Sequence, residues 1–182
     1  GERPVVLCSL GDASITEGEV SEAFQFAVLK KLPVIYLVQD NQWGISVSAE
    51  EARSMSAFEF ADGFKGLHKL QVDGSDFAAA YTTMHAAINF VRTNRKPVLV
   101  HATVPLLGHH TSGVRKEWYR DDLPAAERRD PFPKFKKQLK WQTLSTFDSK
   151  DFCTAIACAI CLLGAISSLA VALSIITVCT GP

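Results

Sequence analysis

The 182-residue sequence lacks an excess of either charge, because 19 Lys and Arg side chains are balanced by 19 Asp and Glu side chains. Non-specific nucleic-acid binding usually requires a strong basic excess, so we expect no nucleic-acid partner. The sequence also lacks internal repeats and low-complexity segments. Its apolar fraction of 47% is too high for a disordered chain and is sufficient for a packed core.

The N-terminus lacks a starting Met and the basic-then-apolar order of a signal peptide, so we expect a chain cut from a longer one. Cysteine is scarce over most of the chain, since Cys8 is the only cysteine before Cys153. Cys8 lies in an apolar run and is expected to be a small buried side chain. Without a disulfide framework, we expect a cytoplasmic location in a bacterium or the mitochondrial matrix in a eukaryote.

Charge is missing from the C-terminal part, where no charged side chain follows Asp151. A helix over residues 152–179 would be about 42 Å long, enough to cross a bilayer core. The sequence therefore divides into a domain over residues 1–140 and an atypical apolar tail over residues 141–182. Three interpretations of the tail stay open: a non-native segment produced by a shifted reading frame, a transmembrane anchor, or a buried helix. A membrane is a partner only if the anchor is genuine.

The first part of the domain has the pattern of a strand–helix–strand unit. Residues 4–10 form an apolar run, which predicts a strand buried on both faces that ends at Gly11 and Asp12. Thr16 and Glu19 have the spacing of a capping box, so we expect a helix to begin there. Its buried face would carry Val20, Phe24, Ala27 and Val28. A second apolar run over residues 34–38 predicts a strand parallel to the first.

The remaining pattern continues in the same way. We expect a loop with one short helix over residues 46–66, a strand over 70–74, a helix over 76–93 and a strand over 97–104. Residues 105–133 are polar and interrupted by proline, which predicts a long functional loop. Strands alternating with helices predict an α/β fold with a mostly parallel sheet and flanking helices.

Polar side chains follow three of the predicted strands: Asp12, Asn41 and the pair His109 and His110. Ligands of parallel sheets bind beyond the carboxyl ends of the strands, so we expect these residues at one edge. A carboxylate, an amide oxygen and a main-chain carbonyl suit Mg²⁺, and a helix start at residues 14–17 would offer N–H groups to a phosphate. This predicts a magnesium–diphosphate site. The alternative, ordinary turn and loop residues, stays open at this point.

Several motifs carry a resemblance to a known family. Residues 11–19 (GDASITEGE) and 40–46 (DNQWGIS) resemble the thiamine-diphosphate motif, which begins Gly-Asp-Gly and ends in Asn-Asn. Residues 72–76, 108–112, 118–120 and 129–131 match further motifs in the same order. Over about residues 3–140 the sequence resembles the alpha subunit of 2-oxo acid dehydrogenases, or the alpha part of a fused alpha/beta chain. The resemblance implies the thiamine-diphosphate-binding fold, with thiamine diphosphate and Mg²⁺ as cofactors.

The resemblance also implies roles for individual residues. Mg²⁺ would be bound by the Asp12 carboxylate, the Asn41 side-chain oxygen and the Trp43 main-chain carbonyl. His110 would lie near the diphosphate and serve as the catalytic residue in reductive acylation of the lipoyl group. The residues expected where the backbone approaches the diphosphate are Gly11, Ala13 and Ser14.

The implied activity is oxidative decarboxylation of a 2-oxo acid, branched-chain in the first place and pyruvate next. The acyl group would pass to the lipoyl domain of the acyltransferase. A further implied partner is the beta subunit, or beta half, which supplies the glutamate that activates the cofactor. We therefore expect no turnover by this chain alone. The alternative is a non-catalytic, membrane-tethered remnant of the same domain.

The sequence departs from the family pattern at two positions of the motif. Ala13 replaces the second Gly, which would disfavour a positive φ there. Asp40 replaces the first Asn and adds a negative charge beside the expected diphosphate. Among the remaining candidates, His109 is equally well explained by packing or by function. We expect structural roles for His68, His85 and His101 and a turn role for Asp73.

Overall fold

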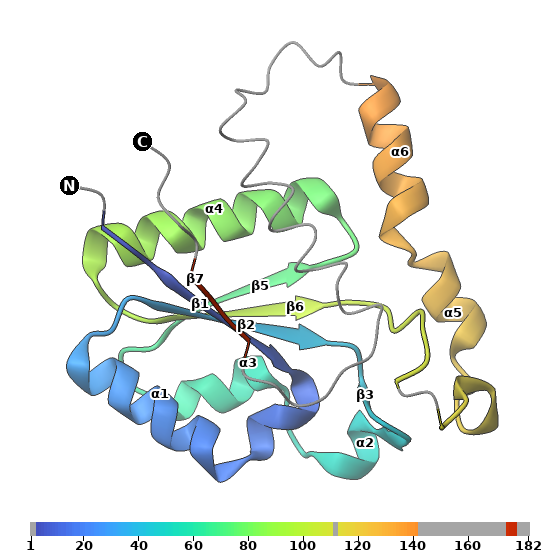
Figure 1. The fold of residues 1–182 in the computed structure, drawn as a ribbon, viewed down its shortest axis with the longest axis horizontal. Helices are drawn as coiled ribbons and strands as arrows, with labels where there is room; N and C mark the ends of the chain where they lie inside the picture. Colours follow the sequence, from blue (N-terminus) through green and yellow to red (C-terminus); the bar gives the residue numbers. More distant parts are fainter. Residues whose placement is uncertain (1–2, 111–112, 142–173, 178–182) are drawn as a thin grey trace.

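The structure is a computed structural model that describes residues 3–110, 113–141 and 174–177. A central sheet is covered by helices on both faces (Figure 1). Its strand order is β5-β6-β2-β1-β7, and every pairing is parallel except that of β7 with β1. The strands are β1 (Val6–Gly11), β2 (Val34–Asp40), β5 (His68–Asp73), β6 (Val98–Thr103) and β7 (Ser174–Thr177). The predicted α/β class with a mostly parallel sheet is confirmed.

The register of the sheet determines which polar residues become neighbours. Gly11, the last residue of β1, pairs with Gln39 of β2. An aspartate follows each member of this pair in the sequence: Asp12 follows Gly11, and Asp40 follows Gln39. On the other side of β2, the pairing with β6 ends at Asp40 opposite Thr103. Parallel pairing therefore brings both carboxylates to the same edge of the sheet.

Two apolar clusters hold the layers together. Helix α4 (Phe77–Asn94) covers one face, where Met84, Ala87 and Val91 pack against strand residues such as Val98 and Val100. Helices α1 (Gly18–Lys30) and α3 (Ala57–Phe60) cover the other face. The second cluster contains Val20, Phe24, Ala27, Tyr36, Val38, Ala57 and Leu99. The central strands are buried on both sides, as their continuous apolar runs predict.

The start of α1 differs from the prediction. The chain passes from β1 directly into a 3-10 helix, η1 (Asp12–Thr16), and α1 begins at Gly18 with Glu17 as its N-cap. The hydroxyl of Thr16 donates to the carbonyl oxygen of Ala13 at 3.1 Å, and the start of α1 has no side-chain cap. The predicted capping box is therefore wrong, whereas the buried face with Val20, Phe24 and Ala27 is confirmed.

The segment predicted as a loop with one short helix is more ordered than expected. A short hairpin, β3 (Trp43–Gly44) with β4 (Val47–Ser48), precedes α2 (Ala49–Ala52), α3 and the 3-10 helix η2 (Ala61–Gly63). Ser48 and Ser56 form capping boxes at the starts of α2 and α3, with Glu51 and Glu59 as their respective partners. These Ser-x-x-Glu patterns are visible in the sequence but lie beside very short apolar runs.

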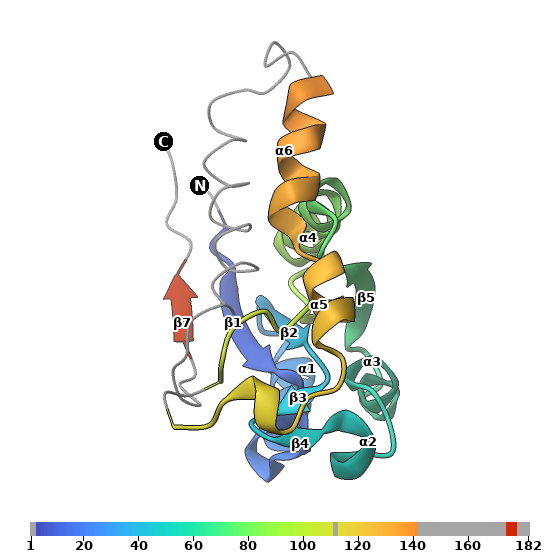
Figure 2. The same ribbon diagram turned by 90° about the vertical axis from the view of Figure 1, so that its right-hand side faces the viewer.

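The predicted long loop over residues 105–133 also contains helices. These are the 3-10 helix η3 (Lys116–Trp118), α5 (Leu123–Arg128) and the start of α6 (Pro131–Trp141). Proline lies in the first turn of both α5 and α6, where its missing N–H needs no intrahelical partner. The ring of Phe135 lies 4.3 Å from that of Phe77, which attaches α6 to the beginning of α4 (Figure 2).

Most of the apolar tail, including most of the proposed anchor over residues 152–179, lies outside the described residues. Residues 174–177 are described, and they form a strand, so a continuous helix over 152–179 is wrong for these four positions. Within the described part of the chain, none of the helices is both long and apolar enough to span a bilayer.

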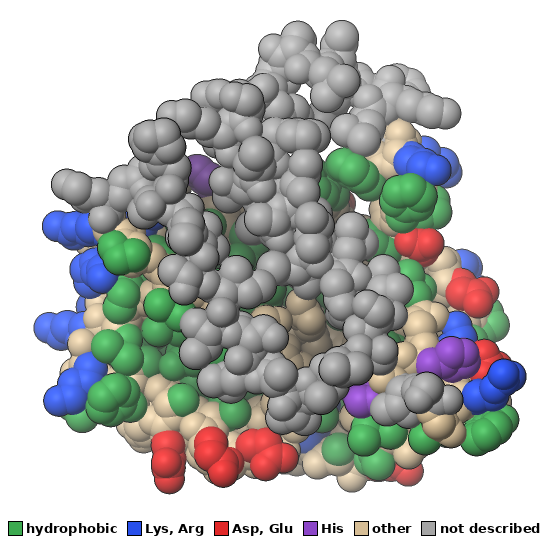
Figure 3. All heavy atoms as spheres, in the orientation of Figure 1, with side chains coloured by type: hydrophobic (Ala, Val, Ile, Leu, Met, Phe, Trp, Pro, Cys, Tyr) green, Lys and Arg blue, Asp and Glu red, His purple; other side chains and the backbone are tan. Residues whose placement is uncertain are grey.

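The described surface combines apolar and charged side chains. Phe26 and Leu29 of α1 are exposed and border a groove that also includes Phe60 and Phe64. On the described part of the face shown in Figure 3, hydrophobic side chains lie between basic and acidic ones. Both signs of charge are therefore present on this face.

Candidate active site

The predicted strand-end residues Asp12 and Asn41 do lie side by side. Asp12 is the first residue of η1 and is almost fully buried, and Asn41 follows β2 directly. The backbone N–H of Asn41 donates to Oδ1 of Asp12 at 3.4 Å. The approach follows from the parallel pairing of β1 and β2, because the carboxyl ends of both strands reach the same edge.

The loop after β2 is stabilised by a hydrogen bond between its main chain and one of its own side chains. Oδ1 of Asn41 accepts a hydrogen bond from the backbone N–H of Trp43 at 2.9 Å. Gln42 and Ile45 have positive φ values of 69° and 60°, which are unfavourable for side chains and most strongly so for the β-branched Ile45. Strain of this kind concentrates at binding and catalytic sites.

The motif position of Ala13 is compatible with this loop. Ala13 is not among the residues with positive φ, so its Cβ causes no backbone strain. A Cβ added to Gly44 would lie 3.0 Å from Cβ of Ala13, so a glycine at position 44 allows the loop to approach η1. Gly11 and Ala13 are exposed and Ser14 is half-buried, which leaves this turn open to a ligand.

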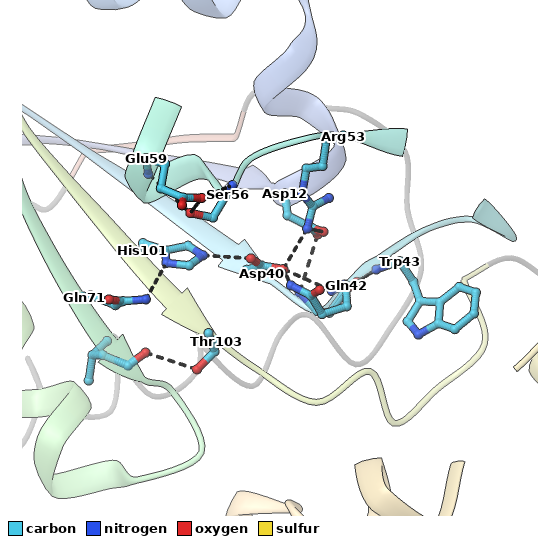
Figure 4. Close-up of polar contacts among 12 residues, drawn as sticks. Asp12, Asp40, Gln42, Trp43, Arg53, Ser56, Glu59, Gln71, His101 and Thr103 are labelled. Atoms are coloured by element: carbon cyan, nitrogen blue, oxygen red, sulfur yellow. Dashed lines mark hydrogen bonds and ion pairs between the residues drawn. The ribbon is translucent and has the colours of Figure 1, made fainter. Parts of the chain in front are cut away.

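Arg53, which follows α2, lies between the two strand-end carboxylates (Figure 4). Its Nη2 atom is 2.6 Å from Oδ2 of Asp12 and 3.1 Å from Oδ1 of Asp40. The Arg53 side chain is only 7% exposed. The contact with Oδ2 of Asp12 is a close ion pair, so this buried oxygen is held by the Arg53 guanidinium.

Asp40 is held from several sides and points back toward the sheet. Its Oδ1 accepts hydrogen bonds from the backbone N–H and the side-chain amide of Gln42, at 3.1 and 2.6 Å, and from Arg53. Its Oδ2 lies 2.7 Å from Nε2 of His101. The negative charge that replaces the family's asparagine is therefore compensated inside the protein.

His101 connects this carboxylate to the middle of the sheet. Because a carboxylate can only accept, Nε2 of His101 carries the hydrogen that is donated to Asp40. The side-chain nitrogen of Gln71 lies 3.2 Å from Nδ1 of the same ring and can donate to it. His101 is buried on β6, as expected for a structural histidine.

The pKa values of Asp12 and Asp40 are shifted in opposite directions. The pKa of Asp12 is raised to about 6, chiefly by burial and further by the Asp40 carboxylate, while the charge of Arg53 opposes both effects. Burial also acts to raise the pKa of Asp40, but the hydrogen bond from His101, the charge of Arg53 and the Gln42 N–H lower it by more. The net pKa of Asp40 is below its ordinary value. Asp12 is thus the carboxylate whose negative charge is less stabilised.

Trp43 connects the loop after β2 to the segment that follows β6. Its indole N–H donates to Oδ2 of Asp122 at 3.3 Å, and its ring packs edge-on against Tyr119 at 5.5 Å. Arg120 lies over the Trp43 ring, contacts both oxygens of Asp122 at 2.7 and 2.8 Å, and donates to the Leu106 carbonyl. The main chain of residue 43 is therefore fixed by contacts far away in sequence.

The two histidines of this segment have different environments. His109 is exposed, and its Nδ1 accepts the backbone N–H of Lys116 at 3.2 Å. His110 is half-buried, and its Nδ1 is buried without a hydrogen-bond partner from the described residues. The next two residues of the motif, 111 and 112, lie outside the described part.

The donor set can be compared with what a cation needs. Within the described ranges, no three His, Cys, Asp or Glu side chains converge as metal ligands. A hard cation would therefore rely on the Asp12 carboxylate together with neutral oxygens. The candidates are the side-chain oxygen of Asn41 and the main-chain carbonyl oxygen of Trp43. Mg²⁺ commonly uses one or two carboxylates and takes its remaining ligands from phosphate and water. The chemistry of these oxygens fits such an ion, with Oδ2 of Asp12, which Arg53 contacts at 2.6 Å, as its anchor.

Sequence reasoning did not identify Arg53, Asp122 or the role of Gln71. Arg53 lies in a connection between two very short helices, where no periodicity indicates the direction of a side chain. Arg120 was included in the motif comparison, but its pairing with Asp122 and Trp43 was not foreseen. The contacts of Asp40 and His101 depend on the register of β2 and β6, which the sequence does not specify.

The chain resembles known proteins over most of its length. A 3-methyl-2-oxobutanoate dehydrogenase subunit alpha from Mycobacterium tuberculosis is 33% identical over 146 residues, which cover 79% of this chain and 40% of that subunit. The mitochondrial 2-oxoisovalerate dehydrogenase subunit alpha from Caenorhabditis elegans is 32% identical, covering 74% of this chain and 32% of that subunit. A pyruvate dehydrogenase E1 component subunit alpha from Porphyra purpurea is 30% identical, covering 81% and 43%.

Among solved structures, a transketolase from Campylobacter jejuni matches 53% of this chain and 15% of its own, with a TM-score of 0.47 and 24% identity. The chain thus spans less than half the length of the alpha subunits that it matches. The family model of the dehydrogenase E1 component matches residues 1–155, which include every strand-end residue described above. The chain therefore belongs to the dehydrogenase E1 component family.

Proposed function

We propose that this chain is the alpha part of the decarboxylating component of a 2-oxo acid dehydrogenase and carries half of a site for thiamine diphosphate and Mg²⁺. The observation that carries the proposal is the adjacent placement of Asp12 and Asn41 at the ends of β1 and β2. When bound, thiamine diphosphate supplies an electron sink for decarboxylation of a 2-oxo acid.

The residues of this chain would bind and orient the cofactor. Asp12 would hold Mg²⁺ through its carboxylate, Asn41 through its side-chain oxygen, and Trp43 through its carbonyl. Asn41 now uses its oxygen to accept from the Trp43 N–H, so a metal would share that oxygen or replace the hydrogen bond. Gly11, Ala13 and Ser14 would line the approach to the diphosphate.

His110 would hold or move a proton during acyl transfer to the lipoyl group. Its buried Nδ1 has no hydrogen-bond partner from the described residues and is free to accept one from a substrate or cofactor. An imidazole is suited to this task because it exchanges protons near neutral pH. The clamp of Trp43 with Asp122 and Arg120 would keep the segment of His110 close to the metal loop.

The substrate and partners follow from the relatives. We favour branched-chain substrates over pyruvate because residues 44–46 and 108–112 resemble the branched-chain enzymes somewhat more. Alpha subunits named for both substrate types match the chain. The beta subunit or beta half would complete the cofactor site, and the lipoyl domain of the acyltransferase would accept the acyl group. Turnover is therefore expected only when the missing parts are supplied.

The binding experiment compares substitutions at two proposed metal ligands with a substitution at an exposed aspartate. Thiamine diphosphate is titrated, with and without Mg²⁺, into the chain supplied with the missing alpha and beta parts. Tryptophan fluorescence is followed for wild type, Asp12→Asn and Asn41→Ala. We expect binding that requires Mg²⁺ in wild type and is weakened at least about tenfold in both variants, because each removes a metal ligand. Asp62→Asn, which alters an exposed aspartate, is the control. Equal binding by wild type and Asp12→Asn would refute the site assignment.

A further inference from the structure

We propose that Arg53 competes with a divalent metal ion for Asp12 and must release this carboxylate before the ion can bind. This proposal rests on the proposed function, because it concerns the same strand-end site. The central observation is that one atom, Nη2 of Arg53, contacts carboxylate oxygens of both Asp12 and Asp40, at 2.6 and 3.1 Å.

The geometry is that of a bridging ion. Arginine usually pairs with one carboxylate through two parallel hydrogen bonds. Here a single nitrogen of Arg53 contacts oxygens of both Asp12 and Asp40, as a small bridging cation would. The contact with Oδ2 of Asp12 is an ion pair at 2.6 Å, so a cation that approaches this oxygen meets the guanidinium there. A divalent cation at the same oxygen would form a stronger electrostatic contact and would repel the guanidinium.

The negative charges of Asp12 and Asp40 explain why a positively charged side chain is needed beside them. The side chains of Asp12 and Asp40 are each 1% exposed, and two buried carboxylates repel each other unless a positive charge lies between them. Arg53 provides one positive charge against two negative ones. With Mg²⁺ in place, the metal would neutralise the carboxylates without Arg53.

The surroundings allow Arg53 to leave without rearranging the fold. Arg53 lies in the short connection between α2 and α3, whose first turns are fixed by the capping boxes of Ser48 and Ser56. The following residues Ser54 and Met55 are exposed, so a displaced guanidinium has access to solvent. Asp40 keeps its contacts with Gln42 and His101 when the arginine moves.

The test measures Mn²⁺ binding to the full chain without thiamine diphosphate, by electron paramagnetic resonance of free Mn²⁺. Arg53→Met removes the competing charge and keeps much of the side-chain volume. We expect it to bind Mn²⁺ at least about tenfold more tightly than wild type, because the ion no longer displaces a resident cation. Arg92→Met, which removes an exposed arginine of α4, should leave the affinity unchanged.

Two further variants distinguish competition between Arg53 and the metal ion from a purely structural role of Arg53. Arg53→Lys keeps the charge on a shorter side chain that cannot easily bridge both carboxylates, so its affinity should lie between those of wild type and Arg53→Met. Adding Asp12→Asn to Arg53→Met should abolish the gain. A purely structural role predicts the opposite, namely weaker Mn²⁺ binding in both Arg53 variants because the carboxylates lose their support.

The outcomes separate this proposal from the proposed function. Equal or weaker Mn²⁺ binding by Arg53→Met, or by Arg53→Lys if the Met variant does not fold, overturns the role of Arg53. Mg²⁺-dependent thiamine-diphosphate binding that survives Asp12→Asn overturns the proposed function instead. Thermal unfolding provides a second readout, in which Mn²⁺ should raise the melting temperature of Arg53→Met by more than that of wild type.

Discussion

The faces of the sheet and its carboxyl edge are built from the same strands but are stabilised in different ways. Across the faces, Phe24, Val38, Leu99 and their neighbours are buried among other apolar side chains. At the edge, Asp12, Asp40 and His101 are equally buried but are polar or charged. The faces depend on the area removed from water, whereas the edge depends on each polar group meeting a particular partner.

This difference determines how each region tolerates change. Truncating an apolar side chain on a face leaves a cavity, and the energetic cost depends on the volume removed. Removing one partner of a polar pair at the edge leaves the other buried and unsatisfied, and the cost depends on its charge. At the edge, Arg53 is the shared partner of two buried carboxylates, Asp12 and Asp40.

The largest expected effect is on the face covered by α1. Phe24 is fully buried and packs edge-on against Tyr36 and Phe64, with ring centroids 4.7 and 5.3 Å away. Phe24→Ala should lower the free energy of unfolding by about 3–5 kcal/mol in urea denaturation. Phe26→Ala on the same helix, where the side chain is 55% exposed, should change it by less than about 1 kcal/mol. Equal losses of stability would contradict the assigned burial of this face.

A smaller effect is expected from restoring the family's asparagine at the edge. Asp40→Asn keeps the shape of the side chain but removes the charge that His101 and Arg53 contact. The free energy of unfolding should fall by about 2 kcal/mol, the value of a hydrogen bond to a charged group. Asp62→Asn, which alters an exposed ion pair with Lys69, should change it by less than about 1 kcal/mol.

The deficit of Asp40→Asn should depend on pH. The pKa of Asp40 in the folded chain is lower than its ordinary value of 3.8, so its carboxylate stabilises the fold above that pH. This contribution is lost as the pH falls through the lowered folded pKa. Urea denaturation of both proteins should show a difference that narrows as the pH falls below about 4. A difference that grows on acidification would mean that Asp40 is not held as an anion.

The smallest expected effect concerns the clamp between the edge and the segment after β6. Trp43→Phe removes the indole N–H that donates to Asp122 but retains an aromatic ring against Tyr119. The expected decrease in the free energy of unfolding is about 1 kcal/mol, as for a single hydrogen bond. Limited trypsin digestion should cut faster after Arg115 and Lys116, because the segment opens more often. Trp118→Phe, at a side chain that is 71% exposed, should digest like wild type.

Periodicity and strand-end position predicted much of the fold. The helix over residues 76–93 appears as α4 within one residue at each end, and the strand over 97–104 appears as β6. The approach of Asp12 and Asn41 was predictable because parallel strands end at one edge. The helices over residues 116–141 were missed because their apolar faces are short, and their prolines were interpreted as interruptions although they begin helices.

The amino-acid pattern established the α/β class, the buried faces and the strand ends that carry the site, because each depends on local periodicity or on residues next to a strand. The tertiary structure decided which partner each buried charge meets. Arg53, Asp40, His101 and Gln71 come from four separate segments, and their contacts depend on strand register and on the connection between α2 and α3. Electrostatic pairing acts over a few ångströms in space, whatever the distance along the chain, so its partners emerge only when the chain is folded.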